Sequence, residues 1–190
     1  MDGRETGERK IVFYCSASYD IDEKFNQAAR EVTRAACSLG YTIVSGGAIK
    51  GTMGVLADEV VRCGGRHIGV LPRFMAQYRF PKLDDTVWTE SMADRKEKMR
   101  EGTSAAIALP GGIGTLDELI GTLTLAKLQK YSGKVIAFNF DGFYEPLKAL
   151  LDHYVSLGML DTASRELILF PQTVDELVGL LKSTRTDDAG

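Results

Sequence analysis

The chain has 190 residues, a length typical of one medium-sized domain with a substantial core. Its net charge of -3 at pH 7 argues against a nucleic-acid partner held mainly by phosphate neutralisation. No apolar run approaches the roughly 20 residues that a membrane-spanning helix needs. The polar N-terminus also lacks the apolar core of a secretory signal, so we expect a cytoplasmic protein.

The cysteines and histidines do not form the patterns of a disulfide framework or a zinc site. Cys15, Cys37 and Cys63 are odd in number and far apart in the chain. His67 and His153 lack the paired spacing of zinc ligands. We therefore expect all five side chains to be structural and no metal to be bound.

The first half of the chain alternates short apolar runs with stretches of helical spacing. Short apolar runs predict buried strands, and apolar residues that recur every three or four positions predict helices. After a lead over 1–9 that we expect to be disordered, the predicted elements are a strand over 10–15, a helix over 22–39, a strand over 41–45, a helix ending near 63 and a strand over 67–71. The segment 73–82 has no clear period and is expected to be a partly packed loop.

The second half continues the same alternation. Its predicted elements are a strand over 86–89, a charged helix over 91–102, a strand over 105–109, a helix ending near 129, a strand over 134–139, a helix over 144–156, a short strand over 167–170 and a helix over 173–182. Residues 184–190 are expected to form a polar tail, so a single domain spans 10–183.

Repeated strand–helix alternation predicts an α/β fold, namely a Rossmann-like, doubly wound and mostly parallel sheet with helices on both faces. Ligands bind such sheets at the carboxyl ends of the strands. Three small or glycine-rich loops, 16–18, 46–54 and 110–118, leave predicted strands at that end. We therefore expect these loops to form one binding site.

The loop over 110–118 combines a glycine turn with the start of a helix. Glycines let the backbone approach a ligand closely, and a helix start offers free N–H groups to an anion. The alternative is a tight turn in which Thr115 caps the helix. Asp117 stands where a dinucleotide fingerprint needs its third glycine, which favours a single phosphate. The residues offered to that phosphate are Gly111, Gly112, Gly114 and Thr115.

Glu118 can be interpreted in two ways. Thr115 and Glu118 have the spacing of a capping box, in which the glutamate bonds back to the threonine N–H. A carboxylate beside an anion site can also take part in a reaction. The two roles are compatible, because a capped carboxylate is an oriented one.

The loop over 46–54 is a second glycine-rich strand exit. It is not a nucleoside triphosphate loop, because Thr52 follows Gly51 where that motif requires lysine. Either Gly46 and Gly47 line a ligand, or the glycines permit a turn with close helix packing.

One face of the charged helix over 91–102 carries an arginine between two methionines. Met92, Arg95 and Met99 are three and four positions apart, so they lie on one side of a helix. Methionine suits a flat apolar ring, and arginine suits an anion. The alternative is an apolar seam in which the Arg95 stem is buried and its head reaches solvent.

Together these motifs resemble those of the Lonely Guy family, the cytokinin riboside 5′-monophosphate phosphoribohydrolases, whose members have also been described as lysine decarboxylases. The family pattern Pro-Gly-Gly-x-Gly-Thr-x-x-Glu is matched over 110–118. Its Met-x-x-Arg-Lys-x-x-Met pattern is matched over 92–99, and its Gly-x-Met-Gly pattern over 51–54. The resemblance extends from about residue 11 to residue 170.

The resemblance implies hydrolysis of the N-glycosidic bond of a purine nucleoside 5′-monophosphate to free base and ribose 5-phosphate, with an adenine-type base, cytokinins included. Arg95 and Glu118 would be the catalytic pair. No metal or organic cofactor is implied, and the protein is expected to be a homodimer. The substrate-binding residues implied are Gly46, Gly47, Met92, Lys96, Gly111, Gly112, Gly114 and Thr115.

The chain departs from the family pattern near these motifs. Ala48 replaces a glycine, Gly121 replaces a second acid, and Leu125 replaces a tryptophan. These changes motivate an alternative function, a carrier or sensor that binds a nucleotide without turning it over. A pyridoxal-phosphate decarboxylase is a weaker alternative, because no lysine stands in a recognisable Schiff-base context.

Overall fold

The computed structural model describes residues 8–187, and it describes side chains as far as residue 183. Most of the expected disordered lead, residues 1–7, and the end of the expected tail, residues 188–190, lie outside the described residues. Seven strands form one sheet. They are β1 Lys10–Tyr14, β2 Thr42–Ser45, β3 His67–Pro72, β4 Asp85–Thr89, β5 Thr103–Ala108, β6 Lys134–Ala137 and β7 Ile168–Leu169.

The strands are arranged in the order β4-β3-β2-β1-β5-β6-β7, and every neighbouring pair is parallel. From β1 the chain builds outward to β4, and it then returns to pair β5 with the other side of β1. The direction of winding therefore reverses between β1 and β5. In doubly wound sheets this reversal opens a crevice at the carboxyl ends of the two strands.

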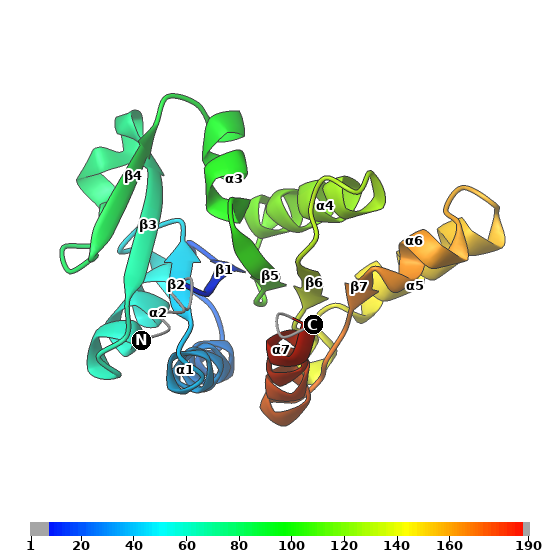
Figure 1. Cartoon of the computed structure of the whole chain (residues 1–190), viewed down its shortest axis with the longest axis horizontal. Coiled ribbons are helices and arrows are strands. Elements are labelled where there is room, and N and C mark those ends of the chain that lie inside the picture. The colour runs from blue at the N-terminus through cyan, green and yellow to red at the C-terminus, as the bar shows by residue number, and fades with distance from the viewer. Residues whose placement is uncertain (1–7, 188–190) are drawn as a thin grey trace, which may run out of the picture.

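The connections between strands are helical (Figure 1). The helices are α1 Glu23–Ser38, α2 Gly51–Arg62, α3 Met92–Arg100, α4 Ile113–Lys127, α5 Glu145–Ser156, α6 Thr162–Glu166 and α7 Val174–Asp187, with two 3₁₀ turns, η1 Arg73–Tyr78 and η2 Phe140–Gly142. Helices α3 and α4 lie on the opposite side of the sheet from α1, α2 and α7 (Figure 1). The expected Rossmann-like α/β architecture is confirmed.

Two hydrophobic cores separate the sheet from its two helical layers. Successive side chains of a strand point to opposite faces, so Phe13 packs with α1, α2 and α7, while Tyr14 packs with α3, α4 and α5. Both residues are almost completely buried. This burial on both faces explains why the strands are continuous apolar runs rather than alternating ones.

The structure differs from the sequence expectations in several local details. The segment 73–82, expected to be a loop, begins with the 3₁₀ turn η1, and the short helix α6 was not predicted. Helix α7 continues to Asp187, past its expected end at residue 182 and into the expected tail. Leu150, one of the apolar residues at helical spacing within the expected helix over 144–156, is 44% exposed and does not face the core.

The described residues contain neither a membrane-crossing helix nor a cluster of metal-binding side chains. Within 8–187 no helix is both long and apolar enough to cross a bilayer. In the same range, no three His, Cys, Asp or Glu side chains gather in a way that could hold a metal ion.

Candidate functional site

A cavity of about 370 Å³ opens at the carboxyl edge of the sheet, where the winding reverses. One wall is the loop that follows β1, residues 15–18, and another is the start of α4, residues 112–118. Side chains from α2, η1 and α3 complete the cavity. The crevice expected between β1 and β5 is therefore lined by residues of all three segments that the sequence selected, the segment 46–54 contributing Met53.

Arg95 and Glu118 meet inside this cavity. Nη1 of Arg95, on α3, donates to Oε1 of Glu118, on α4, over 2.9 Å. Both residues are buried, and each side chain is only 10% exposed. Nε of Arg95 donates to the carbonyl oxygen of Val70 over 3.0 Å, so two contacts fix the orientation of the guanidinium. The alternative that the Arg95 head reaches solvent is wrong.

Burial raises the pKa of Glu118 above its ordinary value, and the charge and hydrogen bond of Arg95 partly oppose that rise. The direction is the one expected when a carboxyl group leaves water. A carboxylate in such a place is more basic than an exposed one, and a neighbouring cation keeps its charged form accessible near neutral pH. Shifted carboxyl groups of this kind are typical of reaction sites, although structural ion pairs also produce them.

The predicted capping box does not form. Helix α4 begins at Ile113 with Gly112 as its N-cap, three residues before the cap expected at Thr115, and no side chain caps it. Thr115 is therefore the third helical residue, and Glu118 lies one turn further on. Glu118 bonds to Arg95 instead of the Thr115 backbone. Glycine is an accepted N-cap residue, so the helix can begin directly after Gly112.

The uncapped start of α4 faces the cavity. The first bond of the helix runs from the N–H of Leu116 to the carbonyl of Gly112, so the N–H groups before it have no helical partner. Gly112 and Gly114 have open space where a Cβ would stand. Among the described residues no hydrogen bond is formed by the Thr115 hydroxyl. These groups could hold an anion such as a phosphate.

Gly111 has a different position from the other glycines of this loop. It does not line the cavity; a Cβ on Gly111 would overlap with the Thr115 hydroxyl and lie 2.8 Å from the Thr115 Cβ. Gly111 instead borders an adjoining apolar cavity of about 320 Å³, which contains Phe25 and Phe143. The absence of a side chain at Gly111 therefore leaves room for Thr115.

Gly46 and Gly47, predicted to line the nucleotide site, do not reach the cavity. Gly46 lies behind the Arg95 guanidinium. Gly47 has φ +64°, and a Cβ there would lie 2.7 Å from the Cα of Gly69 on β3. For Gly47 the structure therefore supports the second of the two alternatives, in which the glycines permit a turn with close packing.

Three methionines from different elements line the cavity: Met53 of α2, Met75 of η1 and Met92 of α3. Their thioether groups could contact a flat aromatic ring. Met75 was not predicted, because η1 has no regular period in the sequence. Backbone bonds attach this segment to the glycine loop, since the N–H of Ile49 donates to the carbonyl of Tyr78 over 2.8 Å.

Lys96 lines the same cavity as Arg95 and Glu118. Its Nζ donates to both carboxylate oxygens of Asp117, at 3.0 and 2.9 Å. The pair is partly exposed and links α3 to α4. Asp117 already neutralises the charge of Lys96. Lys96 could therefore bind an anion in the cavity only if this ion pair opened.

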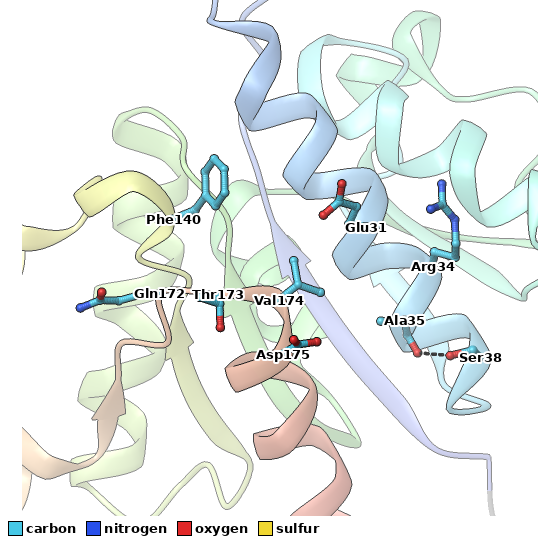
Figure 2. A pocket seen from close by; sticks show the side chains of 9 residues that line it. All are labelled: Glu31, Arg34, Ala35, Ser38, Phe140, Gln172, Thr173, Val174 and Asp175. Atoms are coloured by element: carbon cyan, nitrogen blue, oxygen red, sulfur yellow. Dashed lines mark hydrogen bonds between the residues drawn. The ribbon is translucent and has the colours of Figure 1, made fainter.

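Another cavity, of about 590 Å³, lies between α1 and the start of α7 (Figure 2). Figure 2 shows Val174 and Asp175 of α7 facing α1 across this space. The start of α7 is already capped, because Thr173 accepts from the N–H of Glu176, and Glu176 accepts from the N–H of Gln172. None of the residues predicted for the site lines this cavity.

Sequence comparison identifies a matching family and several relatives. The family model described as "Possible lysine decarboxylase" matches residues 53–181. A rice protein (Oryza sativa subsp. japonica), cytokinin riboside 5′-monophosphate phosphoribohydrolase LOG, is 34% identical over 178 residues, 92% of this chain and 73% of the relative. The phosphoribohydrolase of Mycobacterium tuberculosis is 32% identical over 175 residues, 90% of this chain and 93% of the relative.

Structural comparison finds the same architecture in proteins of lower sequence identity. The molybdenum cofactor binding protein of Rippkaea orientalis has a TM-score of 0.72 at 21% identity, covering 94% of this chain and 98% of that one. The molybdenum cofactor carrier protein of Chlamydomonas reinhardtii has a TM-score of 0.72 at 19% identity, covering 95% and 99%. At such identities the likeness concerns the fold.

Proposed function

The chain belongs to the Lonely Guy family, described as possible lysine decarboxylases, and we propose that it hydrolyses the N-glycosidic bond of a purine nucleoside 5′-monophosphate. The single observation that carries this proposal is the buried Arg95–Glu118 pair beside the uncapped start of α4, in one cavity. The products are the free base and ribose 5-phosphate. Relatives named cytokinin riboside 5′-monophosphate phosphoribohydrolases support this reaction class.

In the proposed reaction the bond between ribose C1′ and the base nitrogen breaks, and its electron pair leaves with the base. Positive charge develops on the ribose, and the Glu118 carboxylate stabilises this charge or orients the attacking water. The water oxygen bonds to C1′, and one proton of that water is transferred to the base. Arg95 orients Glu118 and favours its charged form.

The substrate is proposed to lie with its phosphate at the start of α4 and its base among the methionines. The free N–H groups after Gly112 and the Thr115 hydroxyl suit a single phosphate group. Met53, Met75 and Met92 offer thioethers to a purine ring. Lys96 would contribute to phosphate binding when its ion pair with Asp117 opens.

The proposal is tested by measuring release of adenine from AMP by the purified protein. Glu118→Gln and Arg95→Ala should each lower kcat by roughly 100-fold or more, the effect expected of a group that assists a proton transfer or a developing charge. The control is Thr124→Ala, an exposed position on α4 outside the cavity. Equal release by the wild type and both site variants would refute the proposed reaction.

A non-catalytic carrier or sensor is the second candidate. The observation that favours it is the departure from the family pattern at Gly121, where open space replaces a second acid on α4. The solved structures of cofactor-binding proteins show that this architecture can also carry a ligand. Recovery of intact AMP after long incubation with protein that binds it would favour this function over hydrolysis.

We also propose that the protein is a homodimer. Apolar side chains are exposed at the C-terminal end of α4, on α5 and in the turn after α5. They are Leu128, Leu150, Tyr154, Leu157 and Met159, with exposed fractions between 42% and 77%. Burying such a surface against a second copy would be favourable. Light scattering coupled to size-exclusion chromatography should give twice the 20.8 kDa mass of the chain.

A further inference from the structure

Gly46 lies directly behind the guanidinium of Arg95. A Cβ built on Gly46 would overlap with Nη2 of Arg95 and would lie 3.3 Å from its Cζ. It would also lie 3.0 Å from Sδ of Met53. The space that a side chain at residue 46 would occupy is therefore already filled by the head of Arg95.

The guanidinium cannot move away from Gly46 without losing its present contacts. Its Nε is bonded to the Val70 carbonyl at 3.0 Å, and its Nη1 to the Glu118 carboxylate at 2.9 Å. Gly46 lies against Nη2, the third nitrogen of the same group. A side chain at residue 46 would therefore force the guanidinium to rotate or withdraw, which weakens one or both bonds.

We infer that Gly46 is a positioning residue that seats Arg95 against Glu118, and that it does not bind the nucleotide. The glycine thus orients the Arg95–Glu118 pair and does not line the ligand cavity. It rests on the proposed function for its kinetic consequence only. Its geometric consequence, the pairing of Arg95 with Glu118, can be measured without any substrate.

The substitution Gly46→Ala is suited to this test because the fold can accept it. Gly46 does not have a positive φ, so an alanine there keeps an ordinary backbone conformation. The atoms it would meet are the ends of two flexible side chains, Arg95 and Met53, rather than backbone. Gly47 differs on both counts, with φ +64° and backbone of Gly69 within 2.7 Å of a Cβ.

The first measurement is the pKa of Glu118, followed by ¹³C NMR of carboxyl-labelled glutamate and assigned with Glu118→Gln. Displacing the guanidinium removes the cation that now opposes the effect of burial, so Gly46→Ala should raise this pKa toward its value in Arg95→Ala. In the Arg95→Ala background, adding Gly46→Ala should change the pKa no further. The matched control is Gly121→Ala, because a Cβ at Gly121 meets open space, and it should leave the pKa unchanged.

The second measurement is adenine release from AMP. Gly46→Ala should lower kcat toward the value of Arg95→Ala with little change in KM, and the double variant should be no slower than Arg95→Ala alone. An unchanged Glu118 pKa in Gly46→Ala overturns the inference, as does an equal effect of Gly46→Ala with and without Arg95. If the wild type releases no adenine, the proposed function fails, whereas the NMR titration still decides the role of Gly46.

Discussion

Nη1 of Arg95 lies 2.9 Å from Oε1 of Glu118, although the two residues are 23 positions apart in the chain and belong to different helices. Strand β5 separates α3 from α4 and places both helices on the same face of the sheet. The pair is buried, so its Coulomb attraction is less screened than that of a surface ion pair. The buried pair should therefore influence how the activity depends on pH.

The activity should fall on acidification at a pH above the ordinary range of a glutamate. The proposed reaction needs the charged form of Glu118, and burial raises the pKa of that carboxyl group. The acid limb of kcat/KM against pH should therefore lie higher than for an exposed carboxylate. In Arg95→Lys the acid limb of the profile should move only slightly. In Arg95→Ala the residual activity should have its acid limb at a still higher pH. An acid limb at the ordinary glutamate pKa in the wild type would contradict the assignment.

Removing the Thr115 hydroxyl should weaken the binding of the nucleotide phosphate. A hydrogen bond to a charged group contributes about 1.5–3 kcal/mol, so Thr115→Ala should raise KM for AMP by roughly 10- to 100-fold. The comparison substrate is adenosine, which lacks the phosphate and should be affected little. Thr124→Ala on the exposed side of α4 should behave like the wild type with both substrates. A similar rise in KM for adenosine would contradict the prediction, because Thr115 would then not act through the phosphate.

Protonation of His67 should destabilise the fold. Nε2 of His67 is bonded to the Ser45 hydroxyl at 2.8 Å, Nδ1 is buried with no hydrogen-bond partner in the part of the chain that the structure describes, and burial lowers the pKa of the ring to about 4. Because the unfolded chain then binds a proton more tightly than the folded chain, the free energy of unfolding falls as the pH falls from about 6.5 to about 4. The loss should approach about 3 kcal/mol.

Urea denaturation at several pH values measures this loss. His67→Gln should make the stability less dependent on pH in this interval, whatever its effect on stability at neutral pH. His153→Gln, at an exposed position on α5, is the matched control and should keep the pH dependence of the wild type. If both variants keep that dependence, His67 does not carry it.

Gly121→Ala should stabilise the protein. Gly121 lies inside α4, and a Cβ there meets nothing within 4 Å. Alanine is favoured over glycine in a helix interior by about 0.8–1 kcal/mol, since glycine loses more backbone freedom on folding. Thermal unfolding should show a rise in Tm of a few degrees, and an unchanged or lower Tm would contradict the prediction.

The alternation of apolar runs and helical spacing was sufficient to predict the architecture of the sheet and most of its elements. Local physics explains this success, because a strand buried on both faces must be apolar throughout and an amphipathic helix must repeat its apolar residues at the helical period. The same reasoning placed the loops 16–18 and 110–118 at one edge of the sheet. It failed for η1, whose position depends on backbone bonds to a distant loop.

The chemistry of the site depended on contacts that no local pattern encodes. The motif spacing named Arg95 and Glu118, but only the packing of α3 against β3 and of α4 against β5 brought their charged groups together and buried them. The same packing showed that Gly46 lies behind Arg95 and that Met75 lines the cavity. The sequence alone therefore determined the layers and the types of residue at the strand ends. The tertiary structure decided which of them touch, because such contacts depend on how the long-range packing of several elements places their side chains.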